Sequence, residues 1–330
     1  MVYAKPWFSF EQQLVKLQRR GMLITDEAAA LDYLERIGYY RLSGYWYAFR
    51  ERSELVVQLS PTGGKPKDIK PTRMVLEPFK AGTRFVDAVD LYVFDKRLRL
   101  LAMDALERIE IAIRVDISHT LGQLDPFAYL KPEYLFPGFS QERDERTGLS
   151  KHHDWLGKHA RLIGRSKEEF VKHNKAKYGL PLPIWVACEV WDFGTMSMLF
   201  AGMQEPEQDK IAAAYGIANG RIFATWLRSL NYLRNVCAHH SRLWNRNITE
   251  QPKLPNATAL PWSAPYIGNN HALARCFLLL RICRHLLATI NPKSTWPQRM
   301  KEHLDTFPDL KHLGLDLSGM GAPANWKDEW

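Results

Sequence analysis

"FVDAVDLYVFDKRLRLLAMDALERIEIAIRVDISHTLG", residues 85–122, is the stretch that decides the fold class. Its apolar residues recur at helical spacing, which predicts one long helix with a buried stripe. The predicted stripe consists of Val86, Val89, Val93, Leu100, Ala105 and Ile109. Lys96, Arg97 and Arg99 fall outside this stripe, and Gly122 and Pro126 are expected to end the helix.

Helical spacing continues upstream of this stretch. It predicts helices at 10–17 and 27–37, with Gly21 ending the first and Asp26 or the preceding threonine capping the second. The segment "LSPTGGKPKDIKPTR", residues 59–73, is rich in Pro, Gly and Lys and predicts a loop. We place the first domain boundary there.

Downstream, the helical pattern is interrupted by a basic segment. Residues 131–182 are predicted to be loop-rich, with one short helix at 166–179 that begins with a capping-box pattern at Ser166 and Glu169. Further helices are predicted at 183–203, with a break near Gly194, at 221–244 and at 272–290. The pattern therefore predicts an all-α protein. Its expected parts are an N-terminal helical region at 1–75, a helical domain at 76–295 that contains the basic insertion, and a loosely structured tail at 296–330.

Composition narrows the class of protein. Of the 330 residues 46% are hydrophobic and 25% charged, as in soluble globular proteins. The net charge of +9 favours a polyanionic partner, either nucleic acid or an anionic membrane surface. Arg281 and Arg284 interrupt the most apolar late segment, and no secretory leader is visible, so we expect no membrane partner. Four cysteines without a C-x-x-C pair indicate a reduced, cytoplasmic protein without cofactor or structural metal.

The segment "RSLNYLRNVCAHHSRLWNR", residues 228–246, concentrates polar chemistry at the end of a predicted helix. Asn235 and His239 are one turn apart, and Arg234 lies at the edge of the same face. The preceding turns supply an apolar stripe that anchors the helix: Phe223, Trp226, Leu227, Leu230 and Leu233. We expect His239 and Arg242 to be neighbours as well, with the helix presenting them together.

These side chains suit phosphodiester cleavage without a metal. A histidine can take a proton from a ribose 2′-hydroxyl or give one to the leaving oxygen. An arginine can hold the phosphate oxygens, and an asparagine can position them. Spacing alone is weak support, since Arg146 precedes two histidines at similar spacing. A solvated basic helix end and an RNA-binding face without catalysis remain open, as does a DNA-binding regulator.

The motif "RNVCAHHSRLWNR" resembles the signature of HEPN ribonucleases, in particular of the abortive-infection (Abi, AbiD/AbiF-like) proteins of bacterial defence. The segments "YLERIGYYRLSGYW", "LYVFDKRLRLLAMDALERIEIAIR" and "PIWVACEVWDFGTMSMLF" resemble further blocks of that family in the same order. The resemblance covers most of residues 7–246.

This resemblance implies a HEPN-like helical bundle with an N-terminal helical extension and a metal-independent endoribonuclease site. Arg234 and His239 match the invariant positions of the motif, and Asn235 matches its polar second position. The products would carry a 2′,3′-cyclic phosphate. HEPN nucleases generally pair two motifs across a homodimer, and related Abi proteins are expected to be controlled by a small non-coding antitoxin RNA.

Other residues are candidates for supporting roles. His240 can assist His239, and Arg114 with His119 can form a second motif. The alternative is that Arg114 pairs with Glu110 four residues earlier, or that Glu110 and Arg114 brace the main site. Cys237 with His239 and His240 makes a poor zinc site.

Two further regions are candidates for RNA contact. The aromatic segment around Tyr40, Arg41 and Tyr45 can stack bases, although aromatics at such density are also typical of a core. Basic residues in the insertion and after the motif can follow a phosphate backbone or form a solvated face. These are Lys172, Lys175, Lys177, Arg242 and Arg246.

Overall fold

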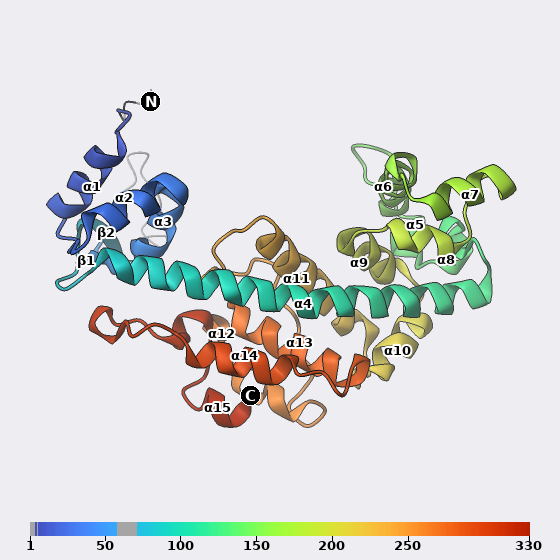
Figure 1. The fold of residues 1–330 in the computed structure, drawn as a ribbon. Helices are drawn as coiled ribbons and strands as arrows, with labels where there is room; N and C mark the ends of the chain where they lie inside the picture. The colour runs from blue at the N-terminus through green and yellow to red at the C-terminus, as the bar shows by residue number, and fades with distance from the viewer. Residues whose placement is uncertain (1–3, 5, 58–70) are drawn as a thin grey trace. The chain divides into compact units, whose positions relative to one another are not determined.

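The computed structural model describes residue 4, residues 6–57 and residues 71–330. Helices make up 63% of the structure and strands 7%, so the chain is predominantly α-helical, as predicted. The α-helices, labelled in Figure 1, are α1 (Phe10–Arg19), α2 (Glu27–Arg36), α3 (Tyr39–Trp46), α4 (Phe85–Leu124), α5 (Pro137–Ser140), α6 (Lys151–Arg165), α7 (Glu169–Tyr178), α8 (Ile184–Ala187), α9 (Phe193–Gly202), α10 (Glu205–Ala214), α11 (Gly220–Ala238), α12 (Asn270–Leu273), α13 (Cys276–Ile290), α14 (Trp296–Asp305) and α15 (Trp326–Glu329). Short 3₁₀ helices lie at Tyr47–Phe49, Ala128–Leu130, Pro132–Tyr134, Cys188–Val190, Pro261–Tyr266, Lys311–Leu313 and Leu317–Met320. None of the helices in the described ranges is both long and apolar enough to cross a membrane.

The chain divides into two compact units. One comprises residues 1–97 and 303–317, and the other comprises residues 98–302 and 318–330. The long helix α4 contributes residues to both. The boundaries predicted near residues 75 and 295 stay predictions.

A small sheet in the first unit corrects the expectation of helices throughout. Strands β1 (Arg50–Val56) and β2 (Thr72–Phe79) pair antiparallel, with Arg50 opposite Phe79 and Val56 opposite Thr72. The two strands are joined by a segment that was predicted as a loop and lies largely outside the described residues. Strand pairing depends on a partner distant in sequence, so the periodicity of either segment alone does not reveal it.

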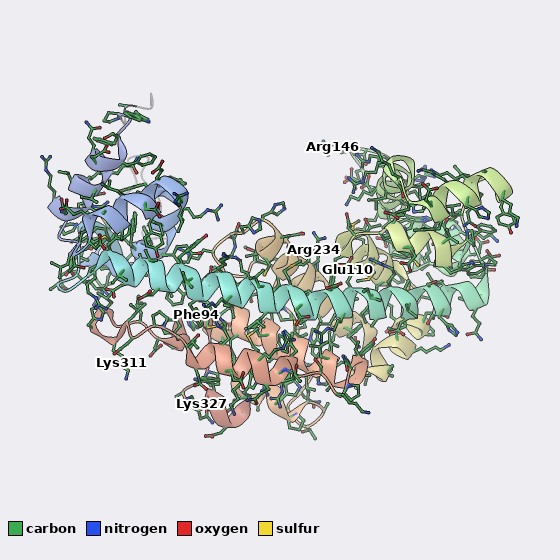
Figure 2. The ribbon with its side chains drawn as sticks, viewed as in Figure 1. Phe94, Glu110, Arg146, Arg234, Lys311 and Lys327 are labelled. Carbon is green, nitrogen blue, oxygen red and sulfur yellow. The ribbon has the colours of Figure 1, made fainter. Side chains whose placement is uncertain are left out.

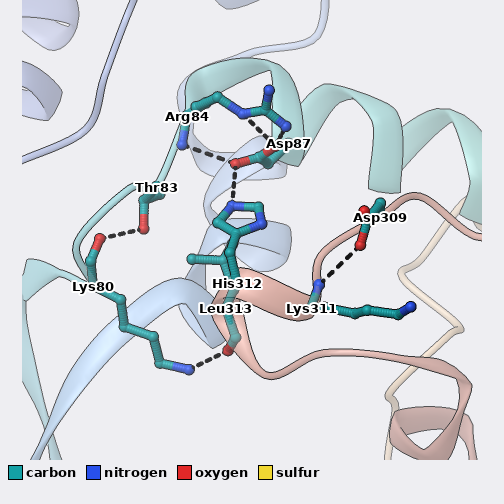
Figure 3. A network of polar contacts seen from close by, with 8 residues as sticks. All are labelled: Lys80, Thr83, Arg84, Asp87, Asp309, Lys311, His312 and Leu313. Atoms are coloured by element: carbon teal, nitrogen blue, oxygen red, sulfur yellow. Dashed lines mark hydrogen bonds and ion pairs between the residues drawn. The ribbon is translucent and has the colours of Figure 1, made fainter.

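A buried carboxylate at the start of α4 anchors the segment that follows α14. The side chain of Asp87 accepts hydrogen bonds from the backbone nitrogen of Arg84 at 2.9 Å and from its guanidinium at 2.6 Å. Nε2 of His312 lies 3.2 Å from the same carboxylate (Figure 3). Nearby, Nζ of Lys80 donates to the carbonyl oxygen of Leu313 at 2.5 Å. These contacts join the late segment to the N-terminal part of its unit.

The buried stripe of α4 differs in part from the predicted one. Val89, Ala105 and Ile109 are buried, as predicted. Val86 and Leu100 are exposed, whereas Arg99 is buried. The buried apolar residues of α4 are Phe85, Ala88, Val89, Leu91, Phe94, Leu98, Ala102, Ala105, Leu106, Ile109, Ile113, Ile117 and Leu121. Apolar residues occur on more than one face of this helix, so spacing alone does not select the face that packs.

In the second unit α11 packs against α9, α10 and α13. The side chain of Asn219 caps it by accepting a hydrogen bond from the backbone nitrogen of Ile222 at 3.0 Å. The predicted stripe is confirmed, because all of its members are fully buried: Phe223, Trp226, Leu227, Leu230 and Leu233. This packing holds the end of α11 in a fixed place.

The basic insertion contains more helix than predicted. Helix α6 begins with a capping box in which the side chains of Ser150 and His153 each bond the other residue's backbone nitrogen. Helix α7 lies within the predicted range, but Ser166 is the C-cap residue of α6 and not the N-cap residue of α7. The predicted capping box at Ser166 is therefore wrong, since Glu168 occupies the N-cap position.

The segment 296–330 is also more ordered than predicted. It includes α14 and α15, and its large apolar side chains are buried, among them Trp296, Met300, Leu304 and Trp326. Nε1 of Trp296 donates a hydrogen bond to the carbonyl oxygen of Leu101 at 2.7 Å, which fixes α14 against α4. Burial of these side chains accounts for the order of a segment that is polar on average.

Candidate functional site

Helix α11 ends at Ala238, so the helix predicted through residue 244 is too long. His239 is the C-cap residue, and its backbone nitrogen donates to the carbonyl oxygen of Asn235 at 3.0 Å. His240 adopts a positive φ of 54°, a conformation that is uncommon outside glycine and that turns the chain away. The predicted adjacency of His239 and Arg242 on one helical face is therefore wrong, because Arg242 lies in the following loop.

Arg234 and Asn235 line an open groove of about 880 Å³ in the second unit. The lining is strongly basic, with side chains from α6 and α11: Lys151, Lys158, Arg161, Arg165, Arg228 and Arg234. Among the described lining residues only Asp192 carries a carboxylate. A groove with this balance of charge attracts the phosphates of a nucleic acid.

One face of α6 builds the basic wall. At about 100° per residue, its four groove-lining cations, Lys151, Lys158, Arg161 and Arg165, fall within an arc of about 80°. The adjacent face is buried and carries His152, Trp155, His159, Leu162 and Ile163. Nε1 of Trp155 donates to the carbonyl oxygen of Thr195 at 2.8 Å, which ties α6 to α9. The cations are thus presented by a helix that is fixed from behind.

Helix α9 closes the groove between these two walls. The side chain of Asp192 caps α9 by accepting a hydrogen bond from the backbone nitrogen of Thr195 at 2.8 Å. The break predicted near Gly194 falls two residues earlier, at this cap. Gly194 lies against Asn231 of α11, where an added Cβ would lie 3.5 Å from the amide. The start of α9 therefore packs closely on the polar face of α11.

Glu110 of α4 lies near Arg234 (Figure 2) and belongs to a charged cluster on α4. Nη2 of Arg114 donates to Oε1 of Glu110 at 2.9 Å and to the carbonyl oxygen of Trp191 at 3.0 Å. Burial raises the pKa of the Glu110 carboxyl, while the guanidinium groups of Arg114 and Arg234 oppose that shift. The alternative that Arg114 pairs with Glu110 is confirmed. Arg234 is therefore close enough to the Glu110 carboxylate for the two charges to attract one another.

The imidazole of His239 is exposed and has no hydrogen-bond or ion-pair partner within the described ranges 6–57 and 71–330. It lies one turn beyond Asn235, outside the lining of the groove. His240 is also exposed, and Arg242 is half-buried. Nε of Arg246 donates to the hydroxyl of Tyr232 at 2.9 Å, so this guanidinium is held against α11.

Residues 32–245 match the family model described as Abi-like protein. The chain belongs to the Abi-like family. The match spans more than half of the 330 residues and takes in α4, α6 and α11, which together carry the groove and the charged cluster. No curated protein and no solved structure matches the chain.

In this Abi-like chain Arg114 and His119 have different surroundings. The side chain of Arg114 is mostly covered and is bound to Glu110 and to the Trp191 carbonyl. His119 is exposed and lines a separate pocket with Trp185. The two side chains therefore differ in exposure and in their partners, and a second catalytic motif stays a prediction.

The aromatic segment that was expected to contact RNA divides into two groups. Tyr40 and Arg41 are exposed on α3. Tyr45 is only 2% exposed, and its hydroxyl donates to the buried carboxylate of Asp95 at 2.8 Å. An RNA contact at Tyr45 does not fit this burial, because its hydroxyl and ring are both used in the core.

The lysines of α7 lie outside the groove lining. Nζ of Lys172 pairs with Glu169 at 2.7 Å, and Nζ of Lys175 donates to the carbonyl oxygen of Ile163 at 2.8 Å. Nζ of Lys177 lies 5.1 Å from the ring centre of Tyr178. Their roles in RNA binding stay predictions, and the α6 cations are the additional candidates that the sequence interpretation missed. Helical spacing within residues 151–165 was the signal that could have identified them.

The four cysteines are buried and form no disulfide bond with one another, and they include Cys237 of the motif. Within the described residues no group of three or more His, Cys, Asp or Glu side chains is arranged to hold a metal ion. Near Cys237 the two histidines of the motif are exposed, so they do not converge with the thiol.

Proposed function

We propose that this Abi-like protein is a metal-independent endoribonuclease of the HEPN type. Membership of the family points to abortive-infection phage defence. The observation that carries the proposal is the position of Arg234 and Asn235 on a groove lined by basic side chains, with the exposed imidazole of His239 one turn further on. RNA is the partner whose backbone such a surface recognises.

In this proposal each motif residue has a separate task. Arg234 holds the non-bridging oxygens of the scissile phosphate and stabilises the charge that develops there. Asn235 positions the phosphate or the imidazole ring. His239 transfers the proton between the ribose 2′-hydroxyl and the leaving 5′-oxygen, which leaves a 2′,3′-cyclic phosphate on the product. His240 assists, and Arg242 contacts the RNA backbone.

The proposal extends to the assembly. The resemblance to HEPN nucleases implies a homodimer in which two copies of the motif act together, and a small non-coding RNA that restrains cleavage in the cell. Mass photometry of the purified protein and sequencing of any RNA that copurifies with it test these two parts separately.

Cleavage is tested with the purified protein, a single-stranded RNA and an excess of EDTA. His239→Ala should lose cleavage while its RNA affinity and circular dichroism spectrum match those of the wild type. His271→Ala, which changes an exposed histidine away from the groove, serves as the matched control. Products with a 2′,3′-cyclic phosphate are expected, and undiminished cleavage by His239→Ala would contradict the proposal.

A second candidate function is RNA binding without catalysis. The observation in its favour is that the lining of the groove includes six cations but not His239. Under this alternative His239→Ala changes nothing, whereas Arg165→Glu weakens binding. The wild-type protein would then bind RNA in the same assay and leave it intact.

A further inference from the structure

A second hollow in the same unit shares no lining residue with the basic groove. Its volume is about 620 Å³, which falls within the range of small-ligand pockets. Helix α4 lines it with Val115, His119 and Gln123, and the segment after α7 lines it with Trp185 and Glu189. Neither Trp185 nor Glu189 has a task in the proposed cleavage.

The side chain of Trp185 is 53% exposed, whereas Trp155, Trp191 and Trp226 are fully buried. The approach of its ring to α4 depends on Gly122. An added Cβ at Gly122 would lie 3.4 Å from Cε3 of Trp185 and 3.2 Å from Cγ2 of Ile184. One edge of the indole is therefore held against the helix while the rest stays open to the pocket.

Polar groups on the pocket wall can form hydrogen bonds with the edge of a planar ligand. The carboxylate of Glu189 is half exposed, and its cation neighbour, Nη1 of Arg114, lies 3.6 Å away. This long contact leaves acceptor capacity on both oxygens. Nζ of Lys210 donates to Oε1 of Gln123 at 3.4 Å, so the amide nitrogen of Gln123 remains a donor and the ammonium lies beside this lining residue.

We propose that this pocket binds the guanine base of a ribonucleotide. The base stacks on Trp185, as bases stack on aromatic side chains generally. Glu189 accepts hydrogen bonds from N1–H and the N2 amino group, and Gln123 donates to O6. Adenine presents an acceptor at N1, which a carboxylate repels, so the pocket prefers guanine. Lys210, which contacts Gln123, and His119 of the lining contact the phosphate.

The chemistry of the wall favours a base over an organic cation. Quaternary ammonium sites use several aromatic faces around one charge. Here the described lining offers a single indole ring together with an amide, an imidazole and a carboxylate. This combination suits a flat ring with hydrogen-bonding edges. The proposal stands apart from the ribonuclease, since binding at this pocket requires no cleavage.

Isothermal titration of the full chain with GMP, IMP and AMP tests the proposal. GMP should bind about tenfold more tightly than AMP, with IMP between them, because a bidentate pair of hydrogen bonds discriminates bases by roughly that factor. Glu189→Gln should abolish the preference for GMP, and Trp185→Ala should abolish binding. Glu142→Gln and Trp7→Ala change an exposed carboxylate and an exposed indole elsewhere, and both should bind as the wild type does.

A competition experiment distinguishes a guanine base within RNA from a free guanine nucleotide. A fluorescent oligoribonucleotide with one guanosine in an adenosine strand is compared with an all-adenosine strand, so the contribution of the basic groove cancels. Tighter binding of the guanosine strand, reversed by GMP, indicates a base within RNA. Equal binding of the two strands with retained GMP binding indicates a free nucleotide. Equal affinity for GMP and AMP, or a GMP preference that survives in Glu189→Gln, overturns the assignment of the pocket.

Discussion

Nε1 of Trp191 donates a hydrogen bond to Nδ1 of His159 across 3.0 Å. This contact requires an imidazole that is unprotonated on that nitrogen, and burial lowers the pKa of His159 to about 4. The ring also stacks on Trp155 with its centre 5.3 Å away. His159 therefore supports α6, and with it the basic wall of the groove, only in its neutral form.

Acid should destabilise the second unit through this histidine. Because the pKa of His159 is lower in the folded chain than the usual 6.5, the unfolded state takes up the proton first as the pH falls. Stability from the neutral ring is complete above pH 6.5 and declines toward pH 4. At pH 5 the loss should be about 2 kcal/mol. Urea unfolding at pH 7 and pH 5 measures it.

The control for this effect is His159→Gln, whose amide oxygen can still accept from Trp191. This variant should show a smaller difference in stability between the two pH values than the wild type. An unchanged difference would mean that other groups set the acid sensitivity.

The cations of α6 should contribute to RNA binding more than those of α7. Arg161→Ala and Arg165→Ala each remove a charge from the groove and should lower the slope of log affinity against log salt by about 0.7. Lys172→Ala removes a lysine that already pairs with Glu169, and we expect a smaller change. Fluorescence anisotropy with His239→Ala as the background avoids cleavage. A larger effect at Lys172 than at Arg165 would favour α7 as the RNA track.

Glu110 should position Arg234 for catalysis. Below the raised pKa of Glu110 its carboxyl is neutral, so Arg234 and Arg114 lose their counter-charge and cleavage should fall as the pH drops through that value. Glu110→Gln keeps the shape of the side chain and should lower kcat with little change in KM. It should also change the position of the acid limb of the pH profile, because only the contribution of His239 would remain, whereas a purely structural role would leave the limb unchanged. An unchanged acid limb in Glu110→Gln would count against the role.

Substitutions of Tyr45 and Tyr40 should have different effects on protein stability, although the two residues are only five positions apart. Tyr45→Phe removes a donor to the buried Asp95 and should cost about 1–3 kcal/mol of unfolding free energy, with RNA affinity unchanged. Tyr40 is 92% exposed, so Tyr40→Ala should leave the free energy of unfolding nearly unchanged. Thermal unfolding and RNA binding of both variants decide between a core role and an RNA contact at each position.

The sequence was sufficient for features that are local to one helix. The apolar stripe of α11 and the position of Arg234 and Asn235 followed from spacing within twenty residues. The end of α11 at Ala238 was not predicted, because helical spacing does not reveal the single backbone conformation of positive φ at His240.

Features that join distant segments could not be predicted in the same way. The groove needs α6 to face α11, and the residues of its two walls are separated by more than one other helix. The burial of Tyr45 depends on Asp95 of α4, and the pairing of β1 with β2 depends on a partner beyond a long connection. Neither charge pattern nor periodicity carries that information.

The hydrogen bond between His312 and Asp87 has a consequence for synthesis of the chain. A ribosome releases residues 1–97 first, yet the unit that they form also requires residues 303–317. Until those late residues emerge, Asp87 lacks its imidazole partner, and the second unit has already been translated in large part. The unit that begins the chain is therefore completed only after most of the second unit has been translated, through contacts of very large sequence separation that form slowly.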